Sequence, residues 1–201
     1  LTATAKAMAR AAAAIEGEVE AGIRDFVVVH DGGWATVVPE RFAALPEELR
    51  LRLLSRLTRA IGGADYGPRL EALDALAAAF SGGDGRATIA ARTLAGVRVE
   101  QRAGRIFLSA ERGRGAPPTL VLASGAQGRW RGRRVGLAVE APAVVTIAPL
   151  GAAGRRRVFE AGGMPPDVLG IPPASAAVVE SAPAVYVDGD LVACPALGWE
   201  A

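Results

Sequence analysis

The sequence predicts an α+β fold, with a small helical N-terminal domain followed by a β-rich α+β domain. Alanine-rich and leucine-rich segments with helical spacing dominate the first 82 residues. From residue 86 onward, short β-branched runs alternate with glycine turns. The run Ser81-Gly82-Gly83-Asp84-Gly85 separates the two textures, and we interpret it as a linker between domains 1–82 and 86–201.

The first predicted helix spans residues 3 to 24, because alanine has the highest helix propensity and Thr2 or Thr4 can cap the first turn. Its alanines allow another helix to approach closely. The β-branched run 26–30 and the segment 34–38 flank an Asp-Gly-Gly turn, which predicts a short hairpin.

A second helix begins at Leu45-Pro46, where a proline in the first turn and two following glutamates suit the positive end of the helix dipole. Gly62-Gly63 ends it as a C-cap. One face of this helix is apolar, and Arg52, Arg56 and Arg59 gather on the opposite face. A third helix fits residues 68–80 and ends at the linker.

The second half reads mainly as strands. Val97 and Val99 alternate with their neighbours, as do Ile106 and Leu108, around a turn at Ala103-Gly104. The further predicted elements are strands at 119–123, 136–140 and 144–148, a short helix at 174–181, and a last hairpin at 186–192.

Positive charge is concentrated in the middle of the chain. Between Gly85 and Arg157 there are fourteen arginines and three acids, a net charge of +11. The residues before this block carry nine Lys or Arg and twelve acids, and those after it carry six acids and no cation. A formal charge of +2 hides this segregation. Guanidinium groups match phosphate oxygens, so the pattern favours a nucleic-acid partner, with a solvated basic face as the alternative.

Composition excludes several classes of site. Cys194 is the only cysteine and His30 the only histidine, which excludes a disulfide framework, a cysteine zinc site and a His–His metal site. No apolar run approaches the roughly 20 residues that span a bilayer, and the charged first segment is unlike a signal peptide. We therefore expect a cytoplasmic protein with no membrane contact and no metal. Because the chain begins at Leu1, we expect a piece of a longer protein; its oligomeric state stays open.

Candidate catalytic residues are few. The Ser81 to Gly85 run suggests a nucleotide loop, but it follows a helix and precedes a strand, so the linker interpretation is favoured. His30 at a strand end is expected to be either a surface histidine or a structural one with satisfied hydrogen bonds, and Cys194 in an apolar stretch to be buried. Asp188 and Asp190 suggest paired carboxylates, although Asp-Gly is also a common hairpin turn. We predict no catalytic residue in this chain.

Two further arginine clusters suggest phosphate contacts. In Arg129-Trp130-Arg131-Gly132-Arg133-Arg134 the indole can stack on a base, or Arg131-Gly132 can form a tight turn with Trp130 packed inside and the arginines exposed. We favour the packed tryptophan. Arg155, Arg156 and Arg157 follow Gly151-Ala152-Ala153-Gly154, which predicts a basic loop tip. The predicted nucleic-acid contacts are Arg52, Arg56, Arg59, Arg129, Arg131, Arg133, Arg134, Arg155, Arg156 and Arg157.

Several segments, taken in order, resemble the C-terminal part of bacterial tRNA(Ile)-lysidine synthase. After the alanine-rich helix, these are Leu45-Pro46 with Leu49–Leu54 and Gly62-Gly63, Pro68–Leu73, Thr93–Val97 with Glu111-Arg112, Arg129–Arg133, Ile147–Gly151, and Ala182–Val185 with Asp188–Trp199. The order across nearly the whole chain carries the resemblance, because each piece alone is mostly apolar residues and glycine.

The resemblance implies a function in tRNA modification. The family is a ligase that joins lysine to the wobble cytidine of a minor isoleucine tRNA, using ATP. Its catalytic residues and ATP site lie in an N-terminal domain that this chain lacks. The implied content of this chain is therefore the substrate-recognition and C-terminal domains that grip tRNA, with no cofactor and no ligase activity of its own.

Two other interpretations remain open. One is a stand-alone β-rich interaction module whose arginine block binds an acidic protein or nucleic acid. The other is a small intact enzyme that uses His30 or the Asp188 and Asp190 turn. Salt-sensitive binding to tRNA but not to an acidic peptide separates the tRNA interpretation from the interaction module.

Overall fold

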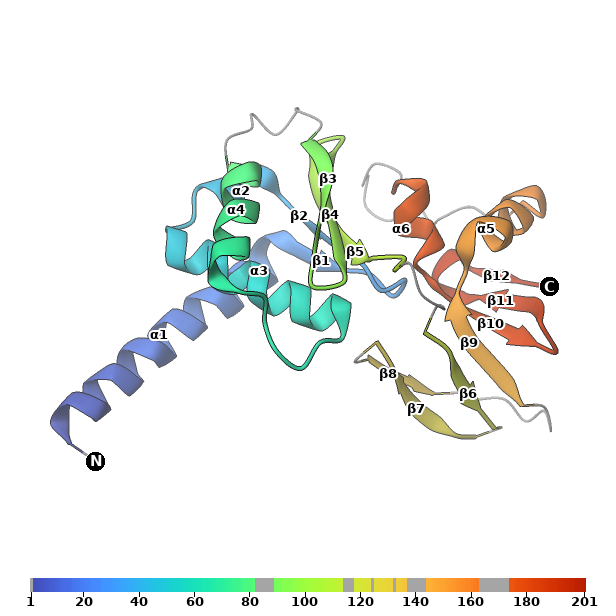
Figure 1. The fold of residues 1–201 in the computed structure, drawn as a ribbon, viewed down its shortest axis with the longest axis horizontal. Coiled ribbons are helices and arrows are strands. Elements are labelled where there is room, and N and C mark those ends of the chain that lie inside the picture. Colours follow the sequence, from blue (N-terminus) through green and yellow to red (C-terminus); the bar gives the residue numbers. More distant parts are fainter. Residues whose placement is uncertain are drawn as a thin grey trace.

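The computed structural model of the chain describes residues 2–81, 89–113, 118–123, 125–131, 133–136, 144–162 and 174–201, with residues 133–136 as backbone only. It confirms the predicted α+β class, because helices and antiparallel sheets fill separate layers (Figure 1). The predicted linker from residue 82 onward and the predicted strand from residue 137 onward lie outside the described residues.

The N-terminal half has four helices and five strands among its described residues. In chain order they are α1 (Ala3–Phe26), β1 (Val27–Val29), β2 (Ala35–Val37), α2 (Pro39–Ala43), α3 (Glu47–Gly62), α4 (Leu70–Ser81), β3 (Ile89–Leu94), β4 (Val97–Arg102) and β5 (Arg105–Ala110). The sequence predicted α1, α3, α4, the β1–β2 hairpin and the β4–β5 hairpin; α2 and β3 are additional.

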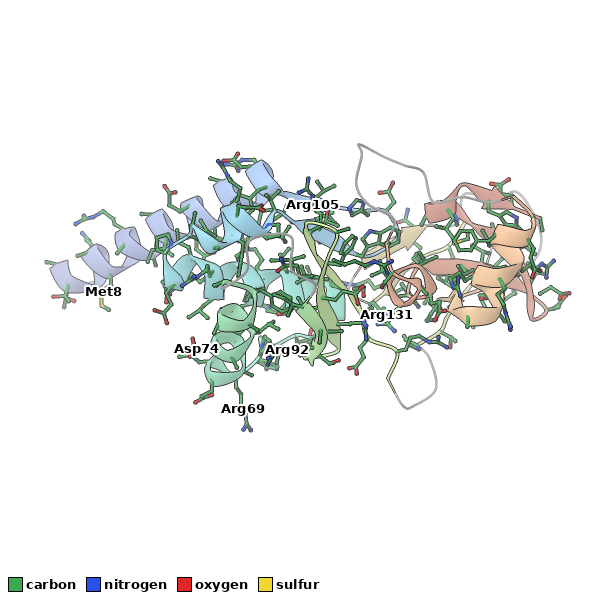
Figure 2. The ribbon with its side chains drawn as sticks, turned by 90° about the horizontal axis from the view of Figure 1, so that it is seen from above. Met8, Arg69, Asp74, Arg92, Arg105 and Arg131 are labelled. Atoms are coloured by element: carbon green, nitrogen blue, oxygen red, sulfur yellow. The ribbon has the colours of Figure 1, made fainter. Side chains whose placement is uncertain are left out.

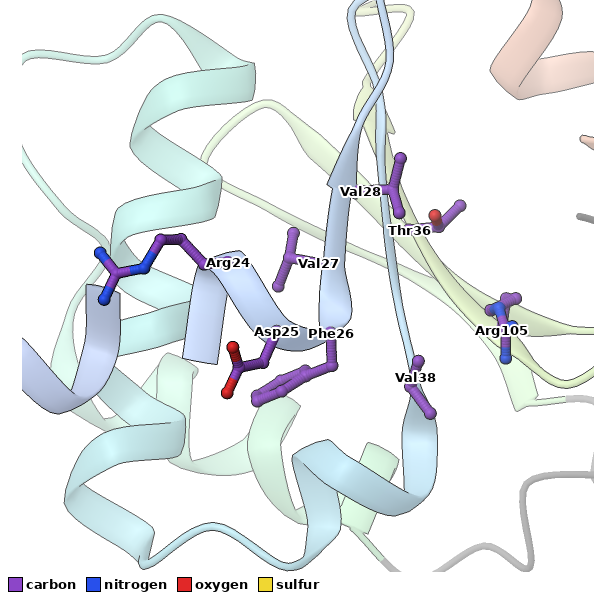
Figure 3. Close-up of a pocket in the computed structure, with 8 residues that line it drawn as sticks. All are labelled: Arg24, Asp25, Phe26, Val27, Val28, Thr36, Val38 and Arg105. Atoms are coloured by element: carbon purple, nitrogen blue, oxygen red, sulfur yellow. The ribbon is translucent and has the colours of Figure 1, made fainter. Parts of the chain in front are cut away.

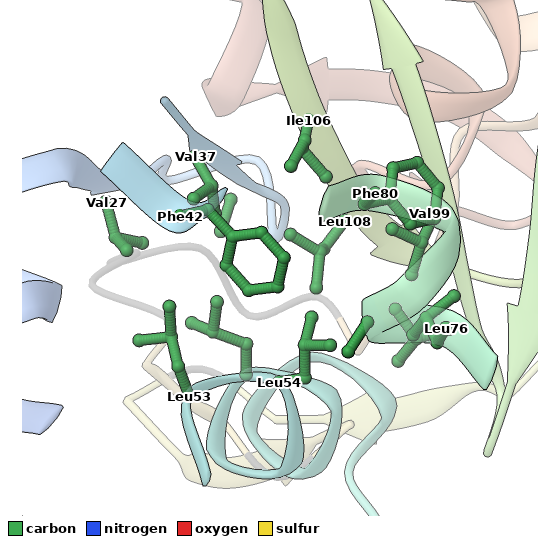
Figure 4. Packing of buried hydrophobic residues seen from close by; sticks show 14 of the residues in the cluster. Val27, Val37, Phe42, Leu53, Leu54, Leu76, Phe80, Val99, Ile106 and Leu108 are labelled. Carbon is green, nitrogen blue, oxygen red and sulfur yellow. The ribbon is translucent and has the colours of Figure 1, made fainter. Parts of the chain in front are cut away.

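Helix α3 shows how the sequence determines this half. It begins after Pro46 and ends at Gly63, whose φ of 73° is a left-handed C-cap that glycine adopts at low cost. The Gly63 amide donates to the Arg59 carbonyl. Its apolar stripe packs into the core shown in Figure 4, and each fully buried leucine there contributes about 1.5–3 kcal/mol. The buried members of the stripe are Leu51, Leu53, Leu54, Leu57 and Ile61.

One antiparallel sheet, the N-terminal sheet, crosses the predicted domain boundary. Its strand order is β1-β2-β5-β4-β3, and β2 pairs directly with β5 through Ala35 opposite Leu108. Val97 and Val99 of β4 share a core with α3 and α4. The division into domains 1–82 and 86–201 therefore differs from the structure, because strands on both sides of the linker form one sheet and one core.

The two faces of the N-terminal sheet pack against different layers. Side chains alternate across a strand, so Ile106 and Leu108 of β5 face the helices whereas Phe107 faces the opposite way. Phe107 and Trp34 join a second core made by the C-terminal half of the chain. Strand β5 is thus shared by two cores.

The C-terminal half contains a second five-stranded sheet, the C-terminal sheet, in the order β12-β11-β10-β9-β6. A core around Val158 and Val178 covers one face of it, and the hairpin β7–β8, with Trp130, covers the other. The elements are β6 (Leu120–Leu122), β7 (Gln127–Trp130), β8 (Arg133–Gly136), β9 (Val145–Pro149), α5 (Gly151–Glu160), α6 (Ala176–Glu180), β10 (Pro183–Val187), β11 (Asp190–Cys194) and β12 (Trp199–Glu200).

Helix α5 replaces the loop that the sequence predicted at residues 151–154. Gly151 starts the helix with a φ of 68°, and Gly154 is buried where a Cβ would lie 2.7 Å from Leu150 Cδ1. Glycine here provides close packing and not a flexible loop. The three consecutive arginines that follow therefore lie on a helix, where successive side chains point about 100° apart.

Candidate nucleic-acid interface

The arginines of α3 contact acids of α1. Arg52 Nη1 donates to Glu16 Oε1 at 2.8 Å, and its Nε donates to Glu48 Oε1 at 2.6 Å. Arg56 Nη2 lies 3.4 Å from Glu16 Oε2 and 3.5 Å from Glu20 Oε1. The hydrogen bonds that Arg52 donates to Glu48 and, to a smaller extent, to Glu16 raise its pKa above the usual value. These two arginines hold α1 against α3, so much of their charge is already neutralised by protein carboxylates.

Arg59, the third member of the α3 set, is exposed. Its Nη2 donates to the Asp65 carbonyl at 3.1 Å, which fastens the chain just after the helix. The row of phosphate contacts predicted along α3 thus consists of two ion-paired side chains and one that binds backbone.

The hairpin β7–β8 is docked against the N-terminal half. Trp130 is buried, and its Nε1 donates to the Pro118 carbonyl at 3.1 Å, which confirms the packed tryptophan. Arg131 forms the turn with a φ of 48°. Its backbone abuts the C-cap of α3, because a Cβ on Gly63 would lie 2.8 Å from the Arg131 carbonyl carbon.

The side chain of Arg131 is half-buried, contrary to the predicted exposure. Its guanidinium lies 5.3 Å from the centroid of Trp130 and makes a long 3.5 Å contact to the Glu111 carbonyl. Burial lowers the pKa of Arg131. Figure 2 shows Arg131 where the two halves of the chain meet. Arg129 is exposed on β7, and the side chains of Arg133 and Arg134 lie outside the described residues.

Helix α5 presents the third set. Arg155 Nε donates to Glu180 Oε1 at 3.1 Å, and Glu180 also accepts from Arg112 Nη1 at 2.5 Å. Arg156 and Arg157 are exposed and form no ion pair with any residue that the structure describes. The Arg157 guanidinium lies 5.9 Å from the centroid of the Trp199 ring. Val158, the next residue along the helix, is fully buried in the C-terminal core.

The three arginine sets do not form one surface. The hairpin and α5 are connected to opposite ends of β9 (Figure 1). The hairpin follows β6, whose last residue Leu122 pairs with Val145 at the start of β9. Helix α5 follows Pro149 at the other end of β9. The α3 set belongs to the other half of the chain. Of the predicted contacts, Arg156 and Arg157 are thus the described pair that is both adjacent and without an acidic partner.

The candidate catalytic residues occupy structural positions. His30 Nε2 lies 3.1 Å from Thr36 Oγ1, its ring stacks on Trp34, and burial lowers its pKa against a smaller opposing effect of Asp31. Burial raises the pKa of the Cys194 thiol to about 11. Asp188 has a φ of 51° in the exposed β10–β11 turn.

No group of three or more His, Cys, Asp or Glu in the described part of the chain is placed to hold a metal ion. A hollow of about 190 Å³ lies beside β1, with Arg24 and Arg105 on opposite sides of a mainly apolar lining (Figure 3). None of the helices that the structure describes has the length and apolar character needed to cross a membrane.

Two contacts were missed at the sequence level. Glu180 binds arginines 68 and 25 residues away, and no local pattern indicates such a pairing. Phe159 is exposed on α5 and lies four residues after Arg155, a spacing that places the two side chains together only once the segment is known to be helical.

Searches against protein-family models and against curated proteins found no match to this chain.

Proposed function

We propose that this chain binds RNA, and that its ligand is transfer RNA, as the tRNA-gripping portion of a tRNA(Ile)-lysidine synthase. The observation that carries the proposal is the exposed face of α5, where Arg156 and Arg157 stand side by side with no acidic partner among the described residues. The segregation of fourteen arginines into the middle of the chain supports it. The lysine ligation and the use of ATP belong, in this proposal, to the family's catalytic domain.

The geometry of α5 suits a phosphate backbone. Arg156 and Arg157 leave the helix about 100° apart, so they form a fan at nearly one level along its axis, whereas Arg155 is paired with Glu180. Such a fan can reach phosphates on either side of a groove. Each phosphate that an arginine neutralises releases counterions from the RNA, which makes binding favourable and sensitive to salt.

The other arginines are less suited to bind RNA, because protein groups already occupy them. Releasing Arg52 or Arg56 for RNA means breaking contacts to Glu16, Glu20 and Glu48, so an RNA phosphate competes with carboxylates already in place. Arg131 holds a turn against Gly63. We therefore assign the main RNA contact to α5, and we assign Arg52 and Arg56 of α3 to ion pairs that link α3 to α1.

The test is a salt titration of binding. Fluorescently labelled tRNA is titrated with the chain at several salt concentrations, and a labelled polyglutamate peptide serves as the acidic-protein control. Two or more phosphate contacts predict a fall of log affinity with log salt that has a slope of about −1.5 or steeper. Binding to tRNA with no salt dependence, or equal affinity for polyglutamate, would reject the proposal and favour the interaction module.

A further inference from the structure

Phe159 is a large apolar side chain on the exposed surface of α5 beside Arg156. Its side chain is 36% exposed, although Val158 beside it is fully buried. Arg155 and Arg156 precede it by four and three residues, so on the helix surface both are its direct neighbours. An aromatic ring therefore stands next to Arg156, one of the two cations that the proposed function assigns to RNA.

The guanidinium beside this ring is held in place. Arg155 Cζ lies 5.9 Å from the ring centroid of Phe159, and Arg155 Nε is fixed by Glu180. The Glu180 side chain is only 12% exposed and is held in turn by Arg112. This chain of contacts orients Arg155 against Phe159 before any ligand arrives, and preorganised groups bind with less loss of conformational entropy.

The tryptophans of this protein do not offer a comparable surface. Trp34, Trp130 and Trp199 are all buried, so the stacking role considered for Trp130 has no exposed ring to perform it. Tyr66 is exposed, but it lies in the loop between α3 and α4 and so in the other half of the chain. Phe159 is thus the large exposed aromatic ring beside the α5 arginines among the described residues.

We propose that Phe159 stacks on an unpaired RNA base while Arg156 contacts the adjoining phosphate and Arg155, held by Glu180, positions the ring; this inference rests on the proposed function. A base inside a duplex has both faces covered by its neighbours, whereas a base in a single-stranded end or bulge offers a free face. Base–aromatic stacking changes affinity by roughly tenfold or more. The site therefore selects RNA that has an unpaired nucleotide beside a helix.

The experiment compares two RNA hairpins that differ only in a four-nucleotide single-stranded 3′ tail. The full chain is measured with Phe159→Leu, which keeps an apolar side chain, and with Phe159→Tyr, which keeps a stacking ring. Tyr66→Leu removes an exposed aromatic elsewhere and is the matched control. A tail carrying 2-aminopurine reports stacking directly as fluorescence quenching.

We expect the parent, Phe159→Tyr and Tyr66→Leu to bind the tailed hairpin roughly tenfold more tightly than the blunt one and to quench 2-aminopurine. Phe159→Leu should lose the preference and the quenching, and keep the parent's affinity for the blunt hairpin. Equal preference in Phe159→Leu and the parent overturns the stacking inference alone. An equal loss for both hairpins also overturns it, since it indicates a packing role. A parent that binds neither hairpin overturns the proposed function as well.

Discussion

Replacing Phe107 by alanine should lower the free energy of unfolding, because Phe107 packs the N-terminal sheet against the C-terminal half of the chain. Phe107 is 1% exposed, and it projects from β5 into the core that contains Trp34 and the C-terminal helices. Its neighbours Ile106 and Leu108 project into the opposite core. Because β5 belongs to both cores, we expect the whole chain to unfold as one cooperative unit, although the sequence predicted two domains.

The expected destabilisation follows from the size of the side chain removed. A buried Phe→Ala change costs about 3–5 kcal/mol through lost burial and the cavity left behind. With a urea m value of about 2–3 kcal/mol/M, the unfolding midpoint should fall by about 1–2.5 M. Phe159→Ala is the matched control, because it makes the same chemical change on an exposed surface and should cost about 1 kcal/mol or less.

Urea unfolding followed by tryptophan fluorescence and by far-UV circular dichroism measures both claims. The fluorescence of Trp34 reports unfolding of the core that contains Phe107, and that of Trp130 and Trp199 reports unfolding of the C-terminal half. We expect the two probes to give coincident transitions in the parent and a shared lower midpoint in Phe107→Ala. Two separated transitions in the parent, or a Phe107→Ala midpoint equal to that of Phe159→Ala, would refute the shared-strand reasoning.

Three further predictions follow from local geometry. Gly63→Ala should destabilise the chain by about 1–3 kcal/mol in a thermal melt, because alanine is strained at a φ of 73° and its Cβ would lie 2.8 Å from the Arg131 backbone. Gly17→Ala is the control: it lies in open space on α1 and should be neutral or stabilising. Because burial lowers the pKa of His30, folded His30 resists protonation, and the free energy of unfolding should decrease as pH falls below about 6.5 in the parent but not in His30→Gln. Cys194, with a pKa near 11, should react with a thiol reagent at pH 8 only as the protein unfolds; rapid labelling of the folded protein would contradict its burial.

The sequence was sufficient where local chemistry decides the structure. Helix α3 could be predicted at both ends, because Pro46 and Gly63 act on their own turns, and the β4–β5 hairpin followed from alternating valines and a glycine turn. Helix α5 was missed because Gly154 reads as a loop signal unless its packing against Leu150 is known. Burial of Trp130 was predicted correctly, since a tight turn leaves the preceding indole facing the core.

The candidate site could be predicted only in part, because the fate of an arginine depends on distant partners. The contact of Arg52 with Glu16 spans 36 residues and occupies a side chain that the sequence predicted to contact RNA. The pairing of β2 with β5, which merges the two predicted domains, likewise joins segments about seventy residues apart. Helical periodicity correctly placed Arg52 and Arg56 away from the apolar stripe, but it carries no information on which helix lies opposite.

The assignment of RNA binding to α5 is tested most directly by comparing the salt dependence of tRNA binding in two double variants. Arg156→Gln with Arg157→Gln removes two arginines that have no acidic partner among the described residues, and Arg52→Gln with Arg56→Gln removes two that contact Glu16. We expect the α5 variant to bind more weakly and to have a salt slope smaller in magnitude by about 1.4–1.8, whereas the α3 variant should keep nearly the parent slope. An unchanged slope in the α5 variant, or a larger loss in the α3 variant, would contradict the assignment of RNA binding to α5.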